Sequence, residues 1–244
     1  MKSNKTKLGF TLAEILITLG ILGIISVILV PQVLSNYRKN ITQIKLKSTL
    51  SILDNAIQKS EIEKSIEWTS DLCPSYKVMT GKECDFYNYS KWIYETFISE
   101  NVKTAQIYPQ MKFANKFSDS NKIQIGPGIL YGFSFRLNNG VLCFVYNGNI
   151  FIVPNERKGL LIGRDAFIFE PYKDCWYAKN CKTRFAPLIN ATRAKWTREQ
   201  LLSACKTGSP NVVHGQLFDN KYYVCSDLFI QNGMEFPKDY PIRF

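Results

Sequence analysis

The sequence predicts an α+β fold. One long N-terminal helix packs on an antiparallel β-sheet, and short disulfide-linked helices follow near the C-terminus. Three observations support this fold class. Residues Phe10 to Val30 form an apolar run. Apolar residues recur at helical spacing from Leu46 to Ile57. Between residues 133 and 153, apolar segments are joined by Asn-Gly turns, which are typical of β-hairpins.

The apolar run from Phe10 to Val30 is long enough to cross a bilayer. As a helix it would measure about 30 Å, which matches the hydrocarbon core of a membrane. Glu14 is its only charged residue. A charged side chain near the centre of a span costs roughly 2.5–3.5 kcal/mol on insertion scales. Glu14 is therefore expected to meet a partner inside the membrane.

The segment from Lys7 to Glu14, followed by apolar residues up to Val30, resembles the N-terminus of type IV pilins and type II secretion pseudopilins. In that family a prepilin peptidase cuts after the glycine and N-methylates the new first residue. The glutamate four residues further on meets the N-terminal amine of a neighbouring subunit during assembly. The resemblance implies cleavage between Gly9 and Phe10, N-methylation of Phe10, and an assembly role for the Glu14 carboxylate.

The resemblance also suggests how the chain is divided. Gly23 and Pro31 stand where related filaments kink or unwind their helix. The expected parts are a prepilin leader (1–9), a transmembrane and assembly helix (10–34), an amphipathic helix that continues into the globular domain (35–67), and an extramembrane α+β pilin-like domain (68–244).

Two other interpretations of the N-terminus explain less. A secretory signal peptide has a shorter apolar core and a small-residue cleavage site, which Ser26 to Pro31 does not offer. An ordinary single-span anchor accounts for the hydrophobicity. It accounts neither for the Gly9-Phe10 pair nor for Glu14.

Charge predicts the orientation. Lys2, Lys5 and Lys7 precede the span without any acidic residue, and a lysine excess beside a span usually stays in the cytoplasm. Arg38 and Lys39 follow the span and argue the other way, but a long folded domain lies beyond them. We expect a single-pass protein of the cytoplasmic membrane. Its N-terminus is cytoplasmic before cleavage, its domain is extracytoplasmic, and it enters a filament after assembly.

Beyond Pro31 the helix is expected to kink, become amphipathic and end near Ser65. Residues 68–88 are predicted to form a loop, and Ser90 to Glu100 a short helix capped by Ser90. The apolar residues expected to face the domain from the long helix are Ile41, Ile44, Leu46, Leu50, Leu53 and Ile57.

The rest of the chain alternates strand and helix signals. Two helices are predicted near the C-terminus. One follows a capping box at Thr197 to Gln200, and the other spans Tyr222 to Gln231 and is ended by Gly233. The tail after it, which carries Pro237 and Pro241, is expected to be extended. The four predicted strands are Phe133–Leu137, Val141–Tyr146, Ile150–Val153 and Ala166–Phe169.

Seven cysteines follow the span and would face an oxidising compartment. Proximity suggests the pairs Cys73–Cys84, Cys175–Cys181 and Cys205–Cys225, although sequence alone leaves the pairing open. Cys143 lies in a strand-like apolar run and is interpreted as a buried core thiol.

No catalytic or metal site is predicted. His214 is the only histidine, no cysteine pair has the spacing of a zinc site, and no phosphate-binding loop is present. Calcium is a weaker alternative, with oxygen ligands from Asp165, Glu170 and Asp174. Their spacing differs from that of an EF-hand loop, so turn and strand-edge roles are favoured.

The formal net charge of +11 allows binding to DNA, anionic lipid or an acidic wall polymer. The basic residues are scattered, however, which favours a simply solvated surface. The densest patch could bind single-stranded nucleic acid by stacking and charge, but this signal is weak. It contains Lys179, Lys182, Arg184, Arg193, Lys195 and Arg198, with Phe185 and Trp196 among them.

The predicted function is that of a non-enzymatic, prepilin-like subunit. It is processed by prepilin peptidase and assembles through its N-terminal helix into a type IV pilus or a type II secretion pseudopilus. A domain of roughly 200 residues is large for a densely repeating subunit, which favours a minor one. Expected partners are other pilin or pseudopilin subunits, the peptidase, an inner-membrane assembly platform and lipid. The alternative is a filament-tip module that binds DNA, a surface or cargo.

Overall fold

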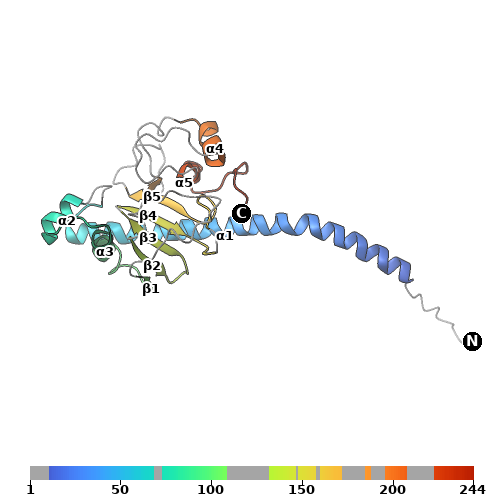
Figure 1. Cartoon of the computed structure of the whole chain (residues 1–244), viewed down its shortest axis with the longest axis horizontal. Coiled ribbons are helices and arrows are strands. Elements are labelled where there is room, and N and C mark those ends of the chain that lie inside the picture. The colour runs from blue at the N-terminus through green and yellow to red at the C-terminus, as the bar shows by residue number, and fades with distance from the viewer. Residues whose placement is uncertain are drawn as a thin grey trace, which may run out of the picture. The chain divides into compact units, whose positions relative to one another are not determined.

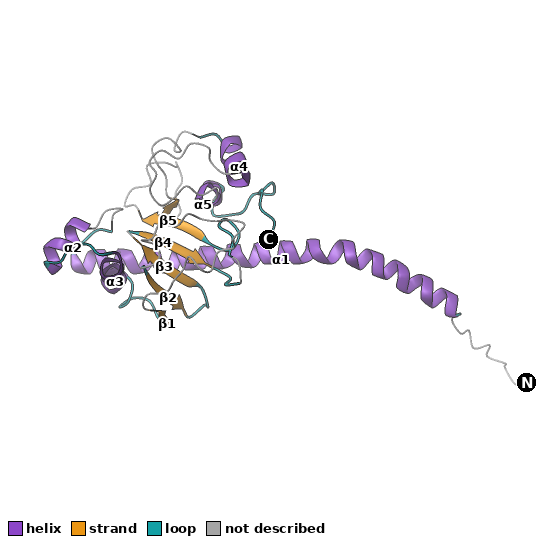
Figure 2. Cartoon of the chain, in the orientation of Figure 1, coloured by secondary structure: helices purple, strands orange, loops and turns teal. Residues whose placement is uncertain are grey.

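The structure is a computed structural model of the chain, and it describes residues 11–68, 73–108, 132–146, 148–157, 160–171, 185–187, 196–207 and 223–244. The helices are α1 (Leu12–Lys64), α2 (Cys73–Thr80), α3 (Phe86–Phe97), α4 (Arg198–Thr207) and α5 (Tyr223–Gln231). The strands are β1 (Thr104–Tyr108), β2 (Phe133–Leu137), β3 (Leu142–Tyr146), β4 (Asn149–Val153), β5 (Phe167–Pro171) and β6 (Phe185–Pro187). Figure 2 shows these helices in purple and the strands in orange.

The chain divides into two units, one of residues 1–40 with Phe244 and one of residues 41–243. In the first unit the described residues up to Asn40 belong to α1, apart from Thr11 just before it. The helix is continuous through Gly23 and Pro31, so the kink expected at the proline does not interrupt it here. Unwinding in an assembled filament stays a prediction.

In the second unit α1 is amphipathic and ends at Lys64, close to the predicted Ser65. Ile44 does not face the domain as expected, because it is 61% exposed. It lies two residues after Thr42, and two residues turn a helix by about 200°. The buried stripe is formed by Thr42, Leu46, Thr49, Leu50, Leu53, Ala56, Ile57 and Ser60.

The segment after α1 returns the chain to the core. Ser65 adopts a positive φ of 54°, which ends the helix, and the Trp68 side chain is then completely buried. Its indole N–H donates to the Gly148 carbonyl at 3.0 Å, and its ring lies 5.2 Å from that of Phe97. A large aromatic side chain thereby joins the end of α1 to α3 and to the β3–β4 turn.

Two expectations for residues 68–100 were wrong. The predicted loop contains α2, which the Cys73–Cys84 disulfide closes into a compact turn of chain. The next helix, α3, begins earlier than predicted because Asp85, not Ser90, is its N-cap and accepts a hydrogen bond from the Asn88 amide. Aspartate, like serine, is a favourable N-cap residue.

Within the described residues the sheet has six antiparallel strands in the order β1-β2-β3-β4-β5-β6, and Figure 1 shows β1 to β5 side by side in this order. The four predicted strands correspond to β2 to β5, and the edge strands β1 and β6 were missed. β1 is largely exposed and carries an irregularity in its pairing, and β6 has only three residues. Short or exposed edge strands lack a strong alternating pattern.

The central strands are buried on both faces. The side chains from Leu142 to Val145 in β3 and from Asn149 to Val153 in β4 are at most 4% exposed. Continuous apolar runs of this kind are typical of strands that are covered on both sides. Cys143 lies among them as a free, buried thiol, and burial raises its pKa.

The C-terminal helices form as predicted. The Thr197 amide donates to Oε1 of Gln200 at 2.8 Å and the Gln200 amide to Oγ1 of Thr197 at 3.3 Å, which is a capping box at the start of α4. Gly233, with a φ of 74°, follows the end of α5. The tail is not extended, because the Tyr240 amide donates to the Pro237 carbonyl and closes a turn.

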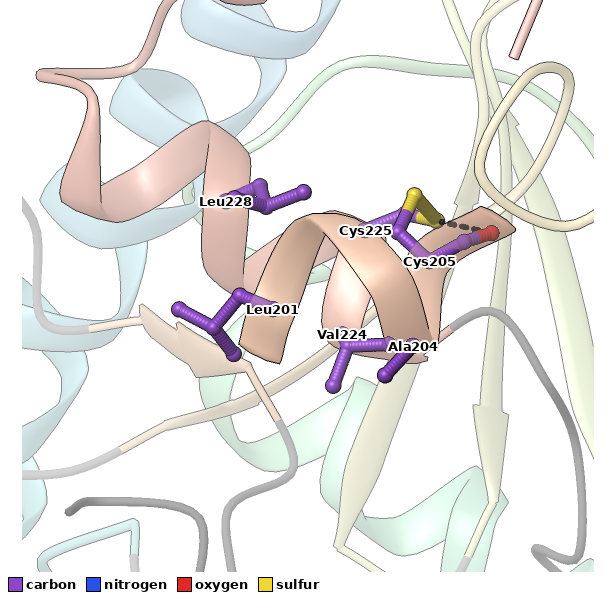
Figure 3. Packing of buried hydrophobic residues seen from close by; sticks show 6 residues of the cluster. All are labelled: Leu201, Ala204, Cys205, Val224, Cys225 and Leu228. Atoms are coloured by element: carbon purple, nitrogen blue, oxygen red, sulfur yellow. Dashed lines mark hydrogen bonds between the residues drawn. A yellow bond between two sulfur atoms is a disulfide. The ribbon is translucent and has the colours of Figure 1, made fainter. Parts of the chain in front are cut away.

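The helices α4 and α5 share a small apolar cluster, shown in Figure 3, and the disulfide Cys205–Cys225 joins them. Both sulfurs belong to completely buried residues. Gly163, with a φ of 83°, lies directly against this disulfide, since a Cβ there would stand 2.7 Å from the Cys225 sulfur. The remaining predicted pair, Cys175–Cys181, lies outside the described residues.

Candidate assembly segment

The N-terminus of α1 is closed by a capping box that sequence analysis did not identify. The Thr11 amide and its hydroxyl both donate to Oε2 of Glu14 at 2.8 Å. The Glu14 amide donates in return to Oγ1 of Thr11 at 3.3 Å. Thr11 is thus the N-cap and Glu14 the third helical residue, the spacing of a Thr-x-x-Glu capping box. The Thr-x-x-Glu spacing is present in the sequence, but the apolar residues around it were interpreted only as a membrane span.

Glu14 is therefore held by its own chain but not fully satisfied. The bonds from Thr11 reach Oε2, and among the described residues no donor reaches Oε1. Its place in the first helical turn is favourable, because unpaired amides and the helix dipole give that end a partial positive charge. A carboxylate with one free oxygen can still accept a hydrogen bond from a cation that approaches from outside.

The other polar side chains of the span bond to their own helix. Oγ1 of Thr18 donates to the carbonyl of Glu14 at 2.9 Å, and Oγ of Ser26 donates to that of Leu22 at 2.7 Å. Hydroxyl groups bonded in this way can enter lipid without an unsatisfied donor. Glu14 is then the one ionisable side chain from Thr11 to Val30.

The apolar surface of this segment is uncovered. Every residue from Thr11 to Leu34 is exposed, and an 18-residue window in α1 has a mean hydropathy of 2.6 with none of it buried. One described helix is thus long and apolar enough to cross a membrane. So large an apolar surface must be covered by lipid or by other protein.

Two glycines interrupt this surface without a role inside the chain. A Cβ on Gly20 or Gly23 would meet nothing within 4 Å. Neither position is therefore required to be glycine by packing within the described chain. Small residues on a membrane helix permit another helix to approach closely.

The remaining predicted N-terminal site residues are only partly placed. Gly9 and Phe10 lie outside the described residues. Gly23 and Pro31 lie within the continuous helix, nine and seventeen positions after Glu14 in the numbering.

Of the residues considered for calcium, Asp165 is the one whose side chain the structure describes. Asp165 is only 1% exposed, and Arg157 and Arg164 form salt bridges with its two oxygens. The Leu161 amide also donates to it. Glu170 lies in β5, and Asp174 lies outside the described residues, as does His214. Among the described residues, no group of three or more His, Cys, Asp or Glu side chains could hold a metal ion.

The basic patch is only partly described, since its residues from 179 to 184 and from 193 to 195 lie outside the described ranges. Arg198 makes two hydrogen bonds to the Asp239 carboxylate at 2.6 and 2.9 Å, and this pairing raises its pKa. Phe185 is completely buried in β6, so its ring is not available for stacking on a base.

Comparison with known families gives two matches. The model of a family described as "Family of unknown function (DUF6613)" matches residues 32–244. That of the "Prokaryotic N-terminal methylation motif" matches residues 4–30 and so covers the predicted cleavage site and Glu14. No curated protein and no solved structure matches the chain significantly.

Proposed function

From the premise that the chain belongs to the family DUF6613 and carries the N-terminal methylation motif of type IV pilins and pseudopilins, we propose a mechanism for its assembly. The chain is a prepilin-like, membrane-anchored subunit. In the proposed mechanism a prepilin peptidase cuts between Gly9 and Phe10 and methylates the new amine. The subunit then joins a filament when Glu14 meets the N-terminal amine of a neighbouring subunit.

One observation carries this proposal: a lone carboxylate, held by its own N-cap, stands at the start of an uncovered apolar helix. An anchor needs only the apolar helix. The carboxylate adds a cost inside the membrane, which a cation from another chain can offset. Oε1 is the oxygen that would accept this amine, while Oε2 keeps its bonds to Thr11.

The energetics favour pairing within the membrane. In a low dielectric an uncompensated charge costs several kcal/mol, so a chain that loses one partner of the pair is penalised more than the net contribution of the pair. Lateral packing of the apolar helices adds van der Waals contact, with Gly20 and Gly23 as points of close approach. The pair then determines the register of neighbouring helices, and the apolar surface determines their proximity.

We further propose that the domain is extracytoplasmic and that the chain is a minor subunit. The lysines before the span support this orientation, and the Cys73–Cys84 and Cys205–Cys225 disulfides agree with an oxidising compartment. The unit of residues 41–243 is large for a subunit that must repeat densely. Quantitative mass spectrometry of purified filaments should find this chain at a small fraction of the most abundant subunit.

The direct test of processing uses the intact chain expressed with and without a prepilin peptidase. We expect the peptidase to remove residues 1–9 and to leave one added methyl group on the amine of Phe10, as read by mass spectrometry of the N-terminal peptide. Gly9→Val should leave the leader attached. Leu8→Val, a change of similar size beside the cleavage site, is the matched control and should be processed. An unprocessed wild-type chain in the presence of active peptidase would contradict the proposal.

A further inference from the structure

The first two turns of α1 in the unit of residues 41–243 are held by polar side chains from distant parts of the chain. On one side, Asn155 in the segment after β4 contacts two residues of the helix. Its Oδ1 accepts a hydrogen bond from Nζ of Lys45, and its Nδ2 donates to Oγ1 of Thr42, both at 2.9 Å. Nζ of Lys45 also donates to the Pro154 carbonyl at 2.9 Å.

The other side of the same two turns is held by the C-terminal tail. Oε1 of Gln43 accepts a hydrogen bond from the Phe236 amide at 2.9 Å. Nζ of Lys47 forms a salt bridge with Oε1 of Glu235 at 3.0 Å. Phe236 is itself fixed in the core, because its ring lies 5.0 Å from Phe229. The tail is therefore a fixed support for the helix.

The helical positions explain why these contacts act together. At about 100° per residue, Lys45 lies on one flank of the buried stripe that contains Thr42, and Gln43 and Lys47 lie on the other. Rotation of the helix in either direction would break contacts on one flank. A slide by one turn, about 5.4 Å, would break the contacts on both flanks at once.

We propose that these contacts form an axial anchor, which keeps α1 from sliding or turning against the sheet when force is applied along the helix. We define the anchor as Thr42, Gln43, Lys45 and Lys47 of α1 with Asn155, Glu235 and Phe236. The proposal rests on the proposed function, because a filament assembled through the N-terminal part of α1 transmits force along that helix. Since α1 is one continuous helix, force from its N-terminal part reaches the unit of residues 41–243 at these residues first.

A second set of polar contacts on the same helix provides a matched comparison. Oγ of Ser60 donates to the Phe97 carbonyl at 3.0 Å and accepts from Nδ2 of Asn101 at 2.9 Å. This set lies four to five turns further along α1. It joins hydroxyl and amide groups like those of the Thr42–Asn155 contact. Force that enters at residue 41 reaches it only after the anchor has yielded.

The test compares Asn155→Ala with Asn101→Ala by pulling single intact chains in detergent micelles. Handles are attached at the exposed positions 38 and 138 through Arg38→Cys and Asn138→Cys, so that the force acts between α1 and the β2–β3 turn of the sheet. Cys143 is buried and the disulfides at 73–84 and 205–225 are closed, so these thiols do not compete. Cys175 and Cys181 lie outside the described residues and are replaced by serine in every chain that is compared. At constant force we expect Asn155→Ala to unfold about tenfold faster than wild type and Asn101→Ala less than threefold faster. In the absence of force, the two substitutions should lower the midpoint temperature of thermal unfolding by similar amounts.

Equal acceleration by the two substitutions, or no acceleration by Asn155→Ala, would overturn the anchor. If Asn155→Ala does not fold, Gln43→Ala replaces it, because that change removes only the bond from the Phe236 amide. The measurement is made on single unassembled chains. A failure of the proposed assembly function therefore leaves its outcome unchanged, and the two proposals can fail separately.

Discussion

Two apolar segments of this chain differ in their exposure to solvent. From Thr11 to Leu34 every residue of the N-terminal segment is exposed, whereas the side chains of Leu142 to Val145 in β3 are completely buried. Both segments have the same kind of side chain. The difference is that β2, β4 and α3 of the same chain pack against β3, and nothing in the described chain covers the start of α1. An apolar segment left open in this way is a surface for lipid and for other subunits.

The polar groups show the same contrast. In the domain, the buried carboxylate of Asp165 is paired with two arginines of its own chain. In the span, Glu14 has only Thr11, and one of its oxygens accepts nothing from the described residues. Among the described residues, the domain pairs this buried acid within its own chain, whereas the proposed function assigns Glu14 a partner from another chain. Each prediction below tests one side of this contrast.

The largest effect is expected for Glu14→Ala. The substitution removes the charge that requires a partner, so membrane insertion should be unchanged while incorporation into filaments falls at least tenfold. Leu16→Ala is the matched control, because it removes a similarly exposed side chain of the same helix without changing its charge. Both quantities can be read from the membrane and filament fractions of one culture. If Glu14→Ala and Leu16→Ala were incorporated into filaments equally well, Glu14 would have no pairing role in assembly.

The next effect concerns the covered side of the comparison. Replacing Cys205 and Cys225 by alanine should lower the free energy of unfolding of the domain by about 3 kcal/mol, since the bond closes a loop with a sequence separation of 20. The same change at Cys73 and Cys84 should cost less. Among the described elements, the helix that this second bond closes, α2, has its main contacts with α3, so it can lose order locally without unfolding the core.

Chemical denaturation of the two double variants measures this difference. Reduction of the native chain gives a second reading, in which the partly exposed Cys73–Cys84 bond should open before the buried Cys205–Cys225 bond. If the Cys205–Cys225 bond were reduced first, the conclusion that the domain shields this bond from solvent would be wrong.

A smaller effect is expected at Thr11. Thr11→Val keeps the shape of the side chain but removes the hydroxyl that caps α1 and holds Glu14, which costs about 1 kcal/mol. We expect incorporation into filaments to fall several-fold, and Thr11→Ser, which retains the hydroxyl, to restore most of it. Quantitative immunodetection of the filament fraction would separate the variants. A valine variant that assembles as well as the serine variant would show that the capping box is not used.

The smallest effect is a pH dependence of the domain. The Tyr240 ring is partly exposed, but its hydroxyl donates to the Gly163 carbonyl, and burial of this group raises its pKa above the usual 10.0. Above about pH 10 the unfolded state then loses this proton before the folded state does, so the stability contributed by Tyr240 falls as pH rises. The midpoint of thermal unfolding should decrease above pH 10, and less steeply in Tyr240→Phe. Parallel curves for the two proteins would contradict the assignment.

The sequence predicted the elements that have strong local patterns. The apolar run, the amphipathic continuation to Lys64, strands β2 to β5 and the capping box at Thr197 have periods or caps that can be read without neighbours. The edge strands were missed because β1 is exposed and β6 is very short, and their pairing depends on strands that lie distant in the sequence.

Contacts between distant residues were the part that could not be predicted. Ile44 was expected in the buried stripe of α1 because its side chain is apolar. The structure places Thr42 there instead, and a threonine is not expected at a buried position. The contacts of Asn155 with Thr42 and Lys45 join residues more than 100 positions apart, and no local pattern encodes them. At the assembly segment Glu14 was predicted from the cost of its charge, while its partner Thr11 was overlooked because hydrophobicity dominates that stretch.

The central claim is that the acid in the uncovered helix is completed by the amine of another subunit. It is tested most directly by treating assembled filaments with a carbodiimide, which joins a carboxylate to an amine in contact with it. Mass spectrometry of the digested filament should find the Glu14 peptide linked to the N-terminal residue of a different chain. Filaments in which Glu14 becomes linked only to Phe10 of its own chain would contradict the account.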